Sequence, residues 1–403
     1  MGKKLKFAIA GFGNRAYSFV LPLLKDEYKE KVEIVAVLDS NPLKLDFARG
    51  ALKDQPQVGY FTDTAKFMQV EADLVMITPP QFAHKELACA ALDAGHNVFL
   101  EKPMARTPEE CREIIAAEKR SGKKVFMGFN LRHHPVCTGI QKRLGQIGHI
   151  QQMICTDFYS HGYSYFRRWH RLEKNSGGLT VEKGCHSIDL LNMYSGSIPV
   201  RVSAFGGLNR FTPDAEGADH CSKCSKIDKC SFYMDVERAE ELTSKGTGIP
   251  AVIVNGGEKV DMCVFNSDKD TMDNITVIIE YANGCRAVLA ECFTSSVKQT
   301  SGRQFILNGW DGQIWASLSD RVVKYFPHSP ADDGKEPLIE NIPPADGNHG
   351  GADNIMLNYV IDCLQNNKPN ENMLTRDGYY AVAVAAAVEV AVREKRIVEI
   401  APF

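Results

Sequence analysis

The stretch FAIAGFGNRA, residues 7–16, ends an apolar run at two closely spaced glycines. Its Gly11, Gly13 and Ala16 form the pattern G-x-G-x-x-A, which is typical of a turn from a strand into a helix. The first glycine permits a tight turn, the second leaves room for a pyrophosphate beside the backbone, and the small third residue lets helix and strand pack closely. N–H groups at the start of the helix would receive the phosphate oxygens. The pattern is common, so its context decides what it means.

The rest of the first 130 residues alternates short β-branched runs with amphipathic segments. Strands are expected at KFAIAGFG (6–13), VEIVAVLD (32–39), VGYF (58–61), DLVMIT (73–78), NVFLEKP (97–103) and KVFMGFN (124–130). Such alternation predicts a parallel sheet with right-handed crossovers. The first part of the chain is therefore expected to be an α/β Rossmann domain, residues 1–130, that binds a dinucleotide.

Asp39 ends the second of these predicted strands. A carboxylate at this position can accept hydrogen bonds from a ribose diol and repel a 2′-phosphate, which favours NAD and leaves NADP as the alternative cofactor. A second interpretation is that Asp39 caps the helix expected over NPLKLDFARG, residues 41–50. The two roles are compatible.

The sequence rhythm changes after residue 130. The stretch NITVIIEYANGCRAVLAECF, residues 274–293, predicts two antiparallel strands that turn at Asn283 and Gly284. A long surface loop is expected from Pro327 to Gly351, followed by helices over roughly 351–366 and 376–394. We therefore expect an α+β domain over residues 131–403 for substrate binding and oligomerisation, with a Cys-rich insertion around 215–265.

Composition excludes several classes of protein. The 403 residues are 44% hydrophobic and 24% charged, with a formal net charge of −3 and scattered basic residues, which argues against nucleic acid as a partner. No run approaches the roughly 18 apolar residues of a membrane span. The N-terminus lacks a small-residue cleavage site, so a cytoplasmic protein without a membrane partner is expected.

The stretch TVEKGCHSIDLL, residues 180–191, has helical spacing. One face is apolar, and a neighbouring face carries three ionisable side chains, Glu182, His186 and Asp189. This polar face has three interpretations: a structural salt-bridge face involving Lys183, a metal site, or a face turned toward a substrate.

Four further stretches, together with the glycine turn, carry a resemblance to a known family. They are ITPPQFAH (77–84), LEKPMA (100–105), GFNLRHHP (128–135) and SGGLTVEKGCHSID (176–189). In this order they resemble the glucose-fructose oxidoreductase, inositol dehydrogenase and rhizopine-catabolism (Gfo/Idh/MocA) family of nicotinamide-dependent oxidoreductases, with a looser match at HGGADNIMLNYV (349–360). The resemblance implies a Rossmann domain, then an α+β domain whose large, mostly antiparallel sheet often supports dimers or tetramers. The active site would lie between the two domains.

The resemblance also implies residue roles. The lysine of its E-K-P motif lies near the nicotinamide and the reacting hydroxyl, which places that role on Lys102. Its D-x-x-x-H arrangement maps onto Glu182 and His186, with glutamate here in place of the more frequent aspartate. Substrate-binding roles fall on Asp189, Trp169 and Arg168. Cofactor-binding roles fall on Gly11, Phe12, Gly13, Asn14, Arg15, Asp39, Ser40, Thr78, Pro79, His84, Glu101, Lys102 and Asn130.

These residues suit the oxidation of a secondary alcohol. An imidazole such as His186 can accept the hydroxyl proton, and an ammonium such as Lys102 can stabilise the developing alkoxide. We expect an NAD(P)-dependent oxidoreductase that acts on CH–OH groups of a sugar, inositol or related polyol, as a homodimer or homotetramer. The alternatives are a glycosidase that uses NAD for transient oxidation and elimination, and a non-catalytic nucleotide-binding regulator.

The stretch HCSKCSKIDKC, residues 220–230, gathers Cys221, Cys224 and Cys230. Zinc in a structural site takes four ligands, and Cys263, at the start of an expected strand CVFNSD, is preferred over His220 as the fourth. An iron–sulfur cluster is a less favoured alternative, and free surface thiols are a third. The sequence thus predicts a structural metal site remote from the chemistry.

Overall fold

A six-stranded parallel sheet forms the first domain in the computed structural model, which describes residues 4–237, 239–241, 250–251, 260–295, 302–328 and 336–403. Its strands are β1 Leu5–Ala10, β2 Val32–Leu38, β3 Gly59–Phe61, β4 Leu74–Ile77, β5 Asn97–Leu100 and β6 Val125–Met127. They lie in the order β3-β2-β1-β4-β5-β6. The expected α/β Rossmann sheet is confirmed, and each predicted strand is present.

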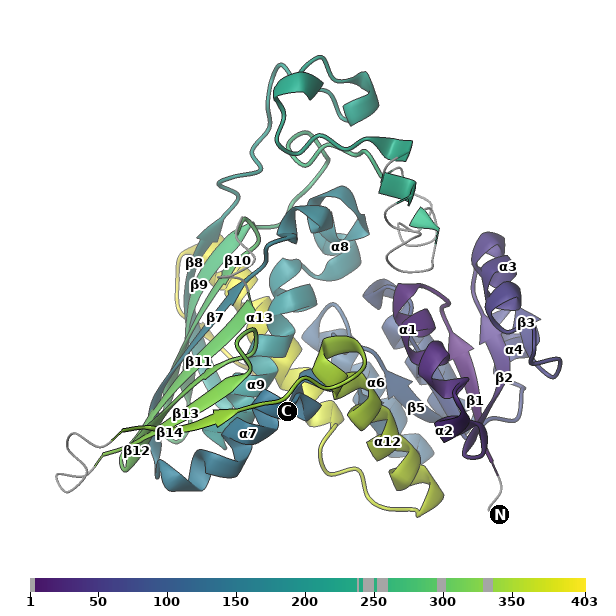
Figure 1. Ribbon diagram of the computed structural model, residues 1–403, viewed down its shortest axis with the longest axis horizontal. Coiled ribbons are helices and arrows are strands. Elements are labelled where there is room, and N and C mark those ends of the chain that lie inside the picture. The colour runs from purple at the N-terminus through teal and green to yellow at the C-terminus, as the bar shows by residue number, and fades with distance from the viewer. Residues whose placement is uncertain (1–3, 238, 242–249, 252–259, 296–301, 329–335) are drawn as a thin grey trace.

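Helices flank this sheet (Figure 1). They are α1 Asn14–Leu23, α2 Asp26–Lys29, α3 Pro42–Ala51, α4 Thr64–Phe67, α5 His84–Asp93 and α6 Pro108–Ser121, with the short 3₁₀ turns η1 Gln81–Ala83 and η2 Asn130–His133. Because both faces of the sheet are covered, its central strand β1 is apolar throughout its second half: the residues from Phe7 to Ala10 are at most 1% exposed.

A nine-stranded mixed sheet forms the second domain. Its strands are β7 Ile150–Phe158, β8 Pro199–Gly207, β9 Asn274–Tyr281, β10 Arg286–Cys292, β11 Gly302–Gly309, β12 Gly312–Ser317, β13 Val322–Pro327, β14 Leu338–Asn341 and β15 Val398–Glu399. They lie in the order β14-β13-β12-β11-β7-β10-β9-β8-β15. Only the β7–β10 pairing within this described sheet is parallel. The expected large, mostly antiparallel sheet is therefore confirmed, including the β9–β10 hairpin that turns at Gly284.

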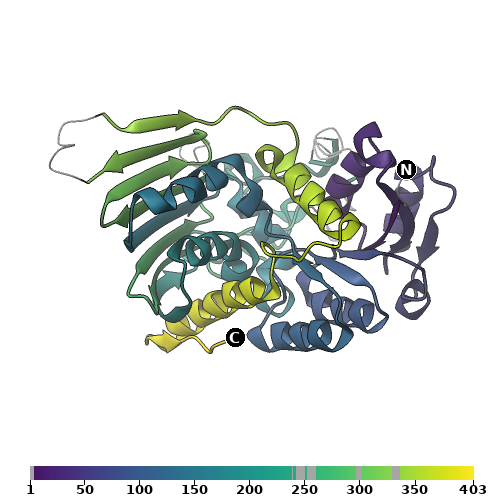
Figure 2. The ribbon, with the colours of Figure 1, turned by 90° about the horizontal axis from the view of Figure 1, so that it is seen from below.

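Helices cover the face of this sheet that looks toward the first domain (Figures 1 and 2). Among the elements with described bounds, the α-helices after residue 130 are α7 Pro135–Arg143, α8 Glu173–Ser176, α9 Cys185–Ser195, α12 Ala352–Gln365 and α13 Thr375–Glu394. Of these, α12 packs against η2 and β1 of the first domain. The short turns are η3 Leu144–Gln146, η4 Gly162–Arg167, η5 Trp169–Arg171, η6 Thr180–Gly184, η7 Cys221–Lys223, η8 Ile227–Lys229 and η11 Asn348–Gly351. Helix α13 packs against β8 and α9 and also against α6 of the first domain, so the buried core continues from one domain into the other.

Three expectations about local structure need correction. The long loop expected from Pro327 to Gly351 contains β14, which pairs with β13, although residues 329–335 lie outside the described residues. Cys263 does not begin a strand, because it follows an isolated bridge between His220 and Met262 and enters a turn. The helix expected from residue 180 opens as a wider π-helical turn, η6, before α9 begins.

Among the described helices, none combines the length and the apolar character that a membrane span needs.

Candidate active site

A cleft of about 340 Å³ lies between the two domains. Its first-domain wall includes Gly13, Asn14, Thr78, Pro79, Glu101 and Lys102. Its second-domain wall includes Arg168, Trp169, His170, Glu182, Lys183 and His186. Residues that follow β1, β4 and β5 therefore meet residues of η6 at the carboxyl ends of the parallel strands, where ligands bind in open α/β sheets.

The glycine turn leaves space where a dinucleotide would need it. Gly11 has φ +86°, and a Cβ on it would stand 2.5 Å from the nitrogen of Pro79, so the turn tolerates no side chain. By contrast, nothing lies within 4 Å of the place where a Cβ on Gly13 would stand. Thr78 fixes the turn at the same point, because its hydroxyl donates a hydrogen bond to the carbonyl oxygen of Gly11 at 2.7 Å. The turn is rigid at Gly11 and open at Gly13.

Asp39 holds this turn from behind. Its two carboxylate oxygens accept hydrogen bonds from the backbone N–H of Phe12 at 2.8 Å and of Asn41 at 2.9 Å. The cap of α3 is Asn41, whose side chain accepts from the N–H of Leu43, so the capping role expected for Asp39 is wrong. The ammonium of Lys44 lies 3.9 Å from the carboxylate and also lines the cleft.

Arg15 ties the two domains together beside the cleft. Its guanidinium contacts Glu101 at 2.6 Å and, through two nitrogens, the carboxylate of Asp353 on α12 at 2.6 and 3.0 Å. Asp353 also accepts from Asn130 at 2.8 Å and lies 3.0 Å from His349. Sequence reasoning gave Asp353 no role, although the HGGADNIMLNYV stretch that contains it was part of the resemblance.

The residues of the first-domain wall fit a dinucleotide on structural grounds. The open space at Gly13 admits a pyrophosphate next to the first N–H groups of α1. The side-chain oxygen of Asn130 is buried and has no hydrogen-bond partner among the described residues, so it is available to a ligand amide.

Lys102 and Glu182 form a buried ion pair across the cleft. The Lys102 Nζ lies 3.2 Å from Oε1 of Glu182 and donates to its carbonyl oxygen at 3.1 Å. That carbonyl belongs to η6, and a π-helical turn is a local widening often found at functional sites. Burial alone would raise the pKa of Glu182, but the ammonium groups of Lys102 and Lys183 outweigh burial and bring the pKa to about 2. Glu182 is therefore ionised.

His186 lies one turn beyond Glu182 and is 8% exposed. Burial, followed by the positive charge of Lys102, lowers its pKa well below the ordinary value, so the imidazole is neutral near pH 7. Its Nδ1 is buried without a hydrogen-bond partner in the described part of the chain. A neutral imidazole beside an ammonium is suited to accept a proton from a hydroxyl group.

Three of the predicted site residues lie outside the lining of the cleft. The substrate contact expected of Asp189 needs correction, because Arg132 holds its carboxylate through two hydrogen bonds of 2.6 and 2.8 Å in the core. His84 is 1% exposed, and its ring nitrogens lie 2.9 and 3.0 Å from backbone carbonyl oxygens of the loops that follow β4 and β5. The side chain of Phe12 is buried in the first-domain core, and its backbone N–H donates to Asp39. The cofactor roles expected for His84 and Phe12 stay predictions.

Ser40, which was predicted to bind the cofactor, is exposed and is not among the residues that line the cleft.

The predicted substrate residues Arg168 and Trp169 line the cleft. The Trp169 ring stacks on His170 with ring centroids 3.8 Å apart and meets Phe82 of the first domain edge-on at 6.3 Å. Sequence reasoning missed His170, Lys183 and Tyr165 as cleft residues, because only the folded chain brings η4, η5 and η6 together.

All four predicted cysteine ligands border one small cavity of about 20 Å³. Backbone hydrogen bonds lower the pKa of Cys224, and the Arg167 guanidinium lies 3.9 Å from the sulfur of Cys221. Within the described ranges, however, no three His, Cys, Asp or Glu side chains are already gathered closely enough to hold a metal ion. Zinc binding stays a prediction, and it requires the thiols to turn toward one another.

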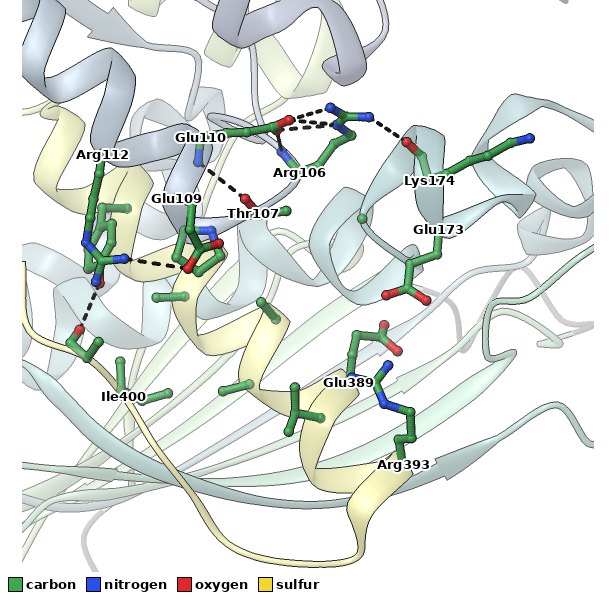
Figure 3. Close-up of a pocket in the computed structure, with 18 of the residues that line it drawn as sticks. Arg106, Thr107, Glu109, Glu110, Arg112, Glu173, Lys174, Glu389, Arg393 and Ile400 are labelled. Atoms are coloured by element: carbon green, nitrogen blue, oxygen red, sulfur yellow. Dashed lines mark hydrogen bonds and ion pairs between the residues drawn. The ribbon is translucent and has the colours of Figure 1, made fainter.

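A larger cavity of about 830 Å³ lies between the start of α6 and α13 (Figure 3). Four of its charged side chains form two ion pairs: Arg106 pairs with Glu110 and also donates to the backbone carbonyl of Lys174, and Arg112 lies 3.7 Å from Glu109. It contains neither the glycine turn nor Lys102 and His186, so we do not assign the chemistry to it.

Comparison with known proteins agrees with this architecture. Residues 5–129 match the family model described as "Oxidoreductase family, NAD-binding Rossmann fold", and residues 140–400 match "Oxidoreductase family, C-terminal alpha/beta domain". The chain belongs to the Gfo/Idh/MocA oxidoreductase family, and its first domain is the NAD-binding Rossmann fold of that family.

Individual relatives are more distant. YteT of Bacillus subtilis (strain 168) is 27% identical over 417 residues, which cover 95% of this chain and 93% of YteT. Among solved structures, the WlbA dehydrogenase from Bordetella pertussis in complex with NADH and UDP-GlcNAcA superposes with a TM-score of 0.72 at 17% identity, with 100% of both chains covered. Levoglucosan dehydrogenase in complex with NADH gives a TM-score of 0.71 at 16% identity over 100% of both chains. At these identities the structures show a shared fold.

Proposed function

We propose that this protein is an NAD-dependent dehydrogenase that oxidises a secondary hydroxyl of a sugar, inositol or related polyol. One observation carries the proposal: a neutral imidazole, His186, and an ammonium, Lys102, line the same cleft as the open glycine turn. The names of structural neighbours, which include a levoglucosan dehydrogenase, support a sugar-like substrate.

In the proposed mechanism, a nicotinamide held beside the glycine turn would supply the hydride acceptor. His186 takes the hydroxyl proton as general base, and Lys102 donates a hydrogen bond to the oxygen on which negative charge develops. Glu182 holds Lys102 in place through its carbonyl oxygen at 3.1 Å and its carboxylate at 3.2 Å. Glu182 therefore positions Lys102.

We propose NAD as the preferred cofactor because Asp39 places a carboxylate, 7% exposed, behind the turn where a 2′-phosphate would approach. The first domain would end near residue 130, and residues 131–403 would supply the substrate wall.

A substrate panel tests the function. Purified protein is mixed with neutral sugars, inositols and sugar acids, each with NAD or NADP, and the absorbance of reduced nicotinamide is followed while glycoside cleavage is assayed in parallel. Reduction of NAD by at least one polyhydroxy compound is expected. Glycoside cleavage without net reduction would instead identify the elimination mechanism, and absence of both reactions would contradict an enzyme of either kind.

A further inference from the structure

The RRWHR stretch, residues 167–171, contains three arginines whose surroundings differ. Arg167 is 4% exposed and donates to two backbone carbonyl oxygens. Arg171 is also 4% exposed and pairs with Asp268 at 2.8 Å. Arg168, between two short 3₁₀ turns, is half-buried and lines the cleft. Two of the three guanidinium groups are thus anchored in the second domain, while the third faces the cleft.

Arg168 has no acidic partner within the described residues. Its guanidinium makes no ion pair or side-chain hydrogen bond there, and burial lowers its pKa. Arg15 and Arg132 behave differently: burial opposes their charge as well, yet neighbouring carboxylates raise their pKa. A half-buried arginine without a carboxylate is costly unless a ligand supplies the anion.

The charges around Arg168 do not cancel. The described lining residues include two carboxylates, Glu182, which is ionised, and Glu101, which pairs with Arg15 at 2.6 Å. Since Lys44 lies 3.9 Å from Asp39, the remaining cations are Lys102, Lys183 and Arg168, which stand against Glu182 alone. The two histidines of the second-domain wall are neutral because burial lowers their pKa. Three positive charges against one leave a surplus of two.

Carboxylates behind this wall do not remove the surplus. Asp157 is paired with Arg303 at 2.6 Å. Glu291 is 1% exposed, and burial raises its pKa well above the ordinary value, so it holds its proton. These two carboxylates therefore leave the surplus positive charge of Lys102, Lys183 and Arg168 unchanged.

We propose that the substrate is an anionic sugar, whose carboxylate or phosphate binds the Arg168 guanidinium while its reacting hydroxyl lies between Lys102 and His186. This inference rests on the proposed dehydrogenase function and narrows its substrate class. The planar guanidinium can donate two parallel hydrogen bonds to either anion, and Lys183 adds a second positive charge nearby. A neutral sugar would leave Arg168 without a counter-ion.

Matched substrate pairs test the proposal. Glucose is compared with glucuronate and with glucose 6-phosphate, and galactose with galacturonate, so that each pair differs in the anionic group alone. For wild-type protein, kcat/KM is expected to be about 10- to 100-fold higher for an anionic member than for its neutral counterpart. The carboxylate and phosphate arms identify which anion is preferred. Equal kcat/KM across every pair would overturn the proposal while leaving dehydrogenase activity intact.

The variant Arg168→Gln sharpens the test. Its kcat/KM is expected to fall at least tenfold more for the anionic substrate than for the neutral one, mainly through KM, and Arg168→Lys should restore part of the loss. Arg286→Gln is the matched control, since Arg286 is 63% exposed on the large sheet and should change neither value.

Titration of the variant with NADH alone separates substrate binding from cofactor binding. The dissociation constant for NADH is expected to stay within about twofold of wild type, because the anion belongs to the sugar. A large loss of NADH affinity would instead assign Arg168 to the dinucleotide phosphates and overturn the proposal.

Discussion

The two walls of the cleft are built in different ways. The first-domain wall is built around a fixed backbone turn: Gly13 provides space, the side chains of Thr78 and Asp39 fasten the turn, and Arg15 is bound by Glu101 and Asp353. The second-domain wall consists of side chains with surplus positive charge, on short turns between β7 and α9. The first-domain wall is thus suited to a ligand of fixed geometry, such as a dinucleotide. The charge of the second-domain wall can instead determine which class of substrate binds.

The largest expected effect concerns the chemical step. Lys102→Ala or His186→Ala should lower kcat by about 10² or more, because each removes a group that acts on the hydroxyl proton or its charge. NAD affinity, measured by fluorescence titration, should change little, since neither side chain fastens the glycine turn. His149→Ala is a control, because His149 is exposed and lies against Trp310. Near-wild-type turnover in both variants would contradict the proposed roles of Lys102, from the first-domain wall, and His186, from the second.

The pH dependence of kcat/KM offers a second test. Because burial and Lys102 lower the pKa of His186, the imidazole stays neutral as the pH falls through about 6.5, the ordinary value for histidine. The value of kcat/KM at pH 5.5 should therefore be close to the value at pH 7. With an ordinary histidine as base, kcat/KM would be about tenfold lower at pH 5.5 than at pH 7. A pH–rate profile whose acid limb has a midpoint at or above 6.5 would contradict His186 as a buried base.

A smaller effect is expected at the first-domain wall. The substitution Asp39→Asn removes the negative charge but keeps one hydrogen-bond acceptor for the turn. The ratio of kcat/KM with NADP to kcat/KM with NAD should then rise about fivefold, which is the size expected for one screened charge interaction. Lys44→Gln is the matched control, because it removes the neighbouring cation and should not raise that ratio. If Asp39→Asn leaves the ratio unchanged, Asp39 serves the turn alone.

The smallest effect on catalysis is expected at the cysteine cavity, which belongs to neither wall. Protein purified under reducing conditions without chelator should carry about one zinc per chain, bound by Cys221, Cys224, Cys230 and Cys263. Metal analysis measures this directly. Cys224→Ser should lower zinc content and melting temperature while kcat changes less than about threefold. Protein free of both zinc and iron–sulfur absorbance would leave these residues as ordinary thiols.

The sequence was informative where local pattern determines structure. Alternating β-branched runs predicted the Rossmann sheet, and the helical spacing of Glu182 and His186 correctly placed both on one polar face. The sequence did not predict contacts between segments far apart in the chain. The carboxylate of Asp189 binds Arg132, which lies in a turn 57 positions away, and this contact keeps Asp189 out of the cleft. Asp353 escaped notice for the same reason, since its partner Arg15 stands 338 positions earlier.

The π-helical turn over Thr180–Gly184 holds one residue more than an α-helical turn does. Because the widened turn absorbs this extra residue, the side chains of α9 face as they would after an α-helical turn with one residue fewer. Deleting one residue within the turn should therefore let it close as an ordinary α-helix with His186 still directed toward the cleft. The effect of the wider turn is local, because the carbonyl oxygen of Glu182 lies within it and accepts from the Lys102 ammonium at 3.1 Å. The extra residue thus bears on how the lysine is held, while the direction of the histidine does not depend on it.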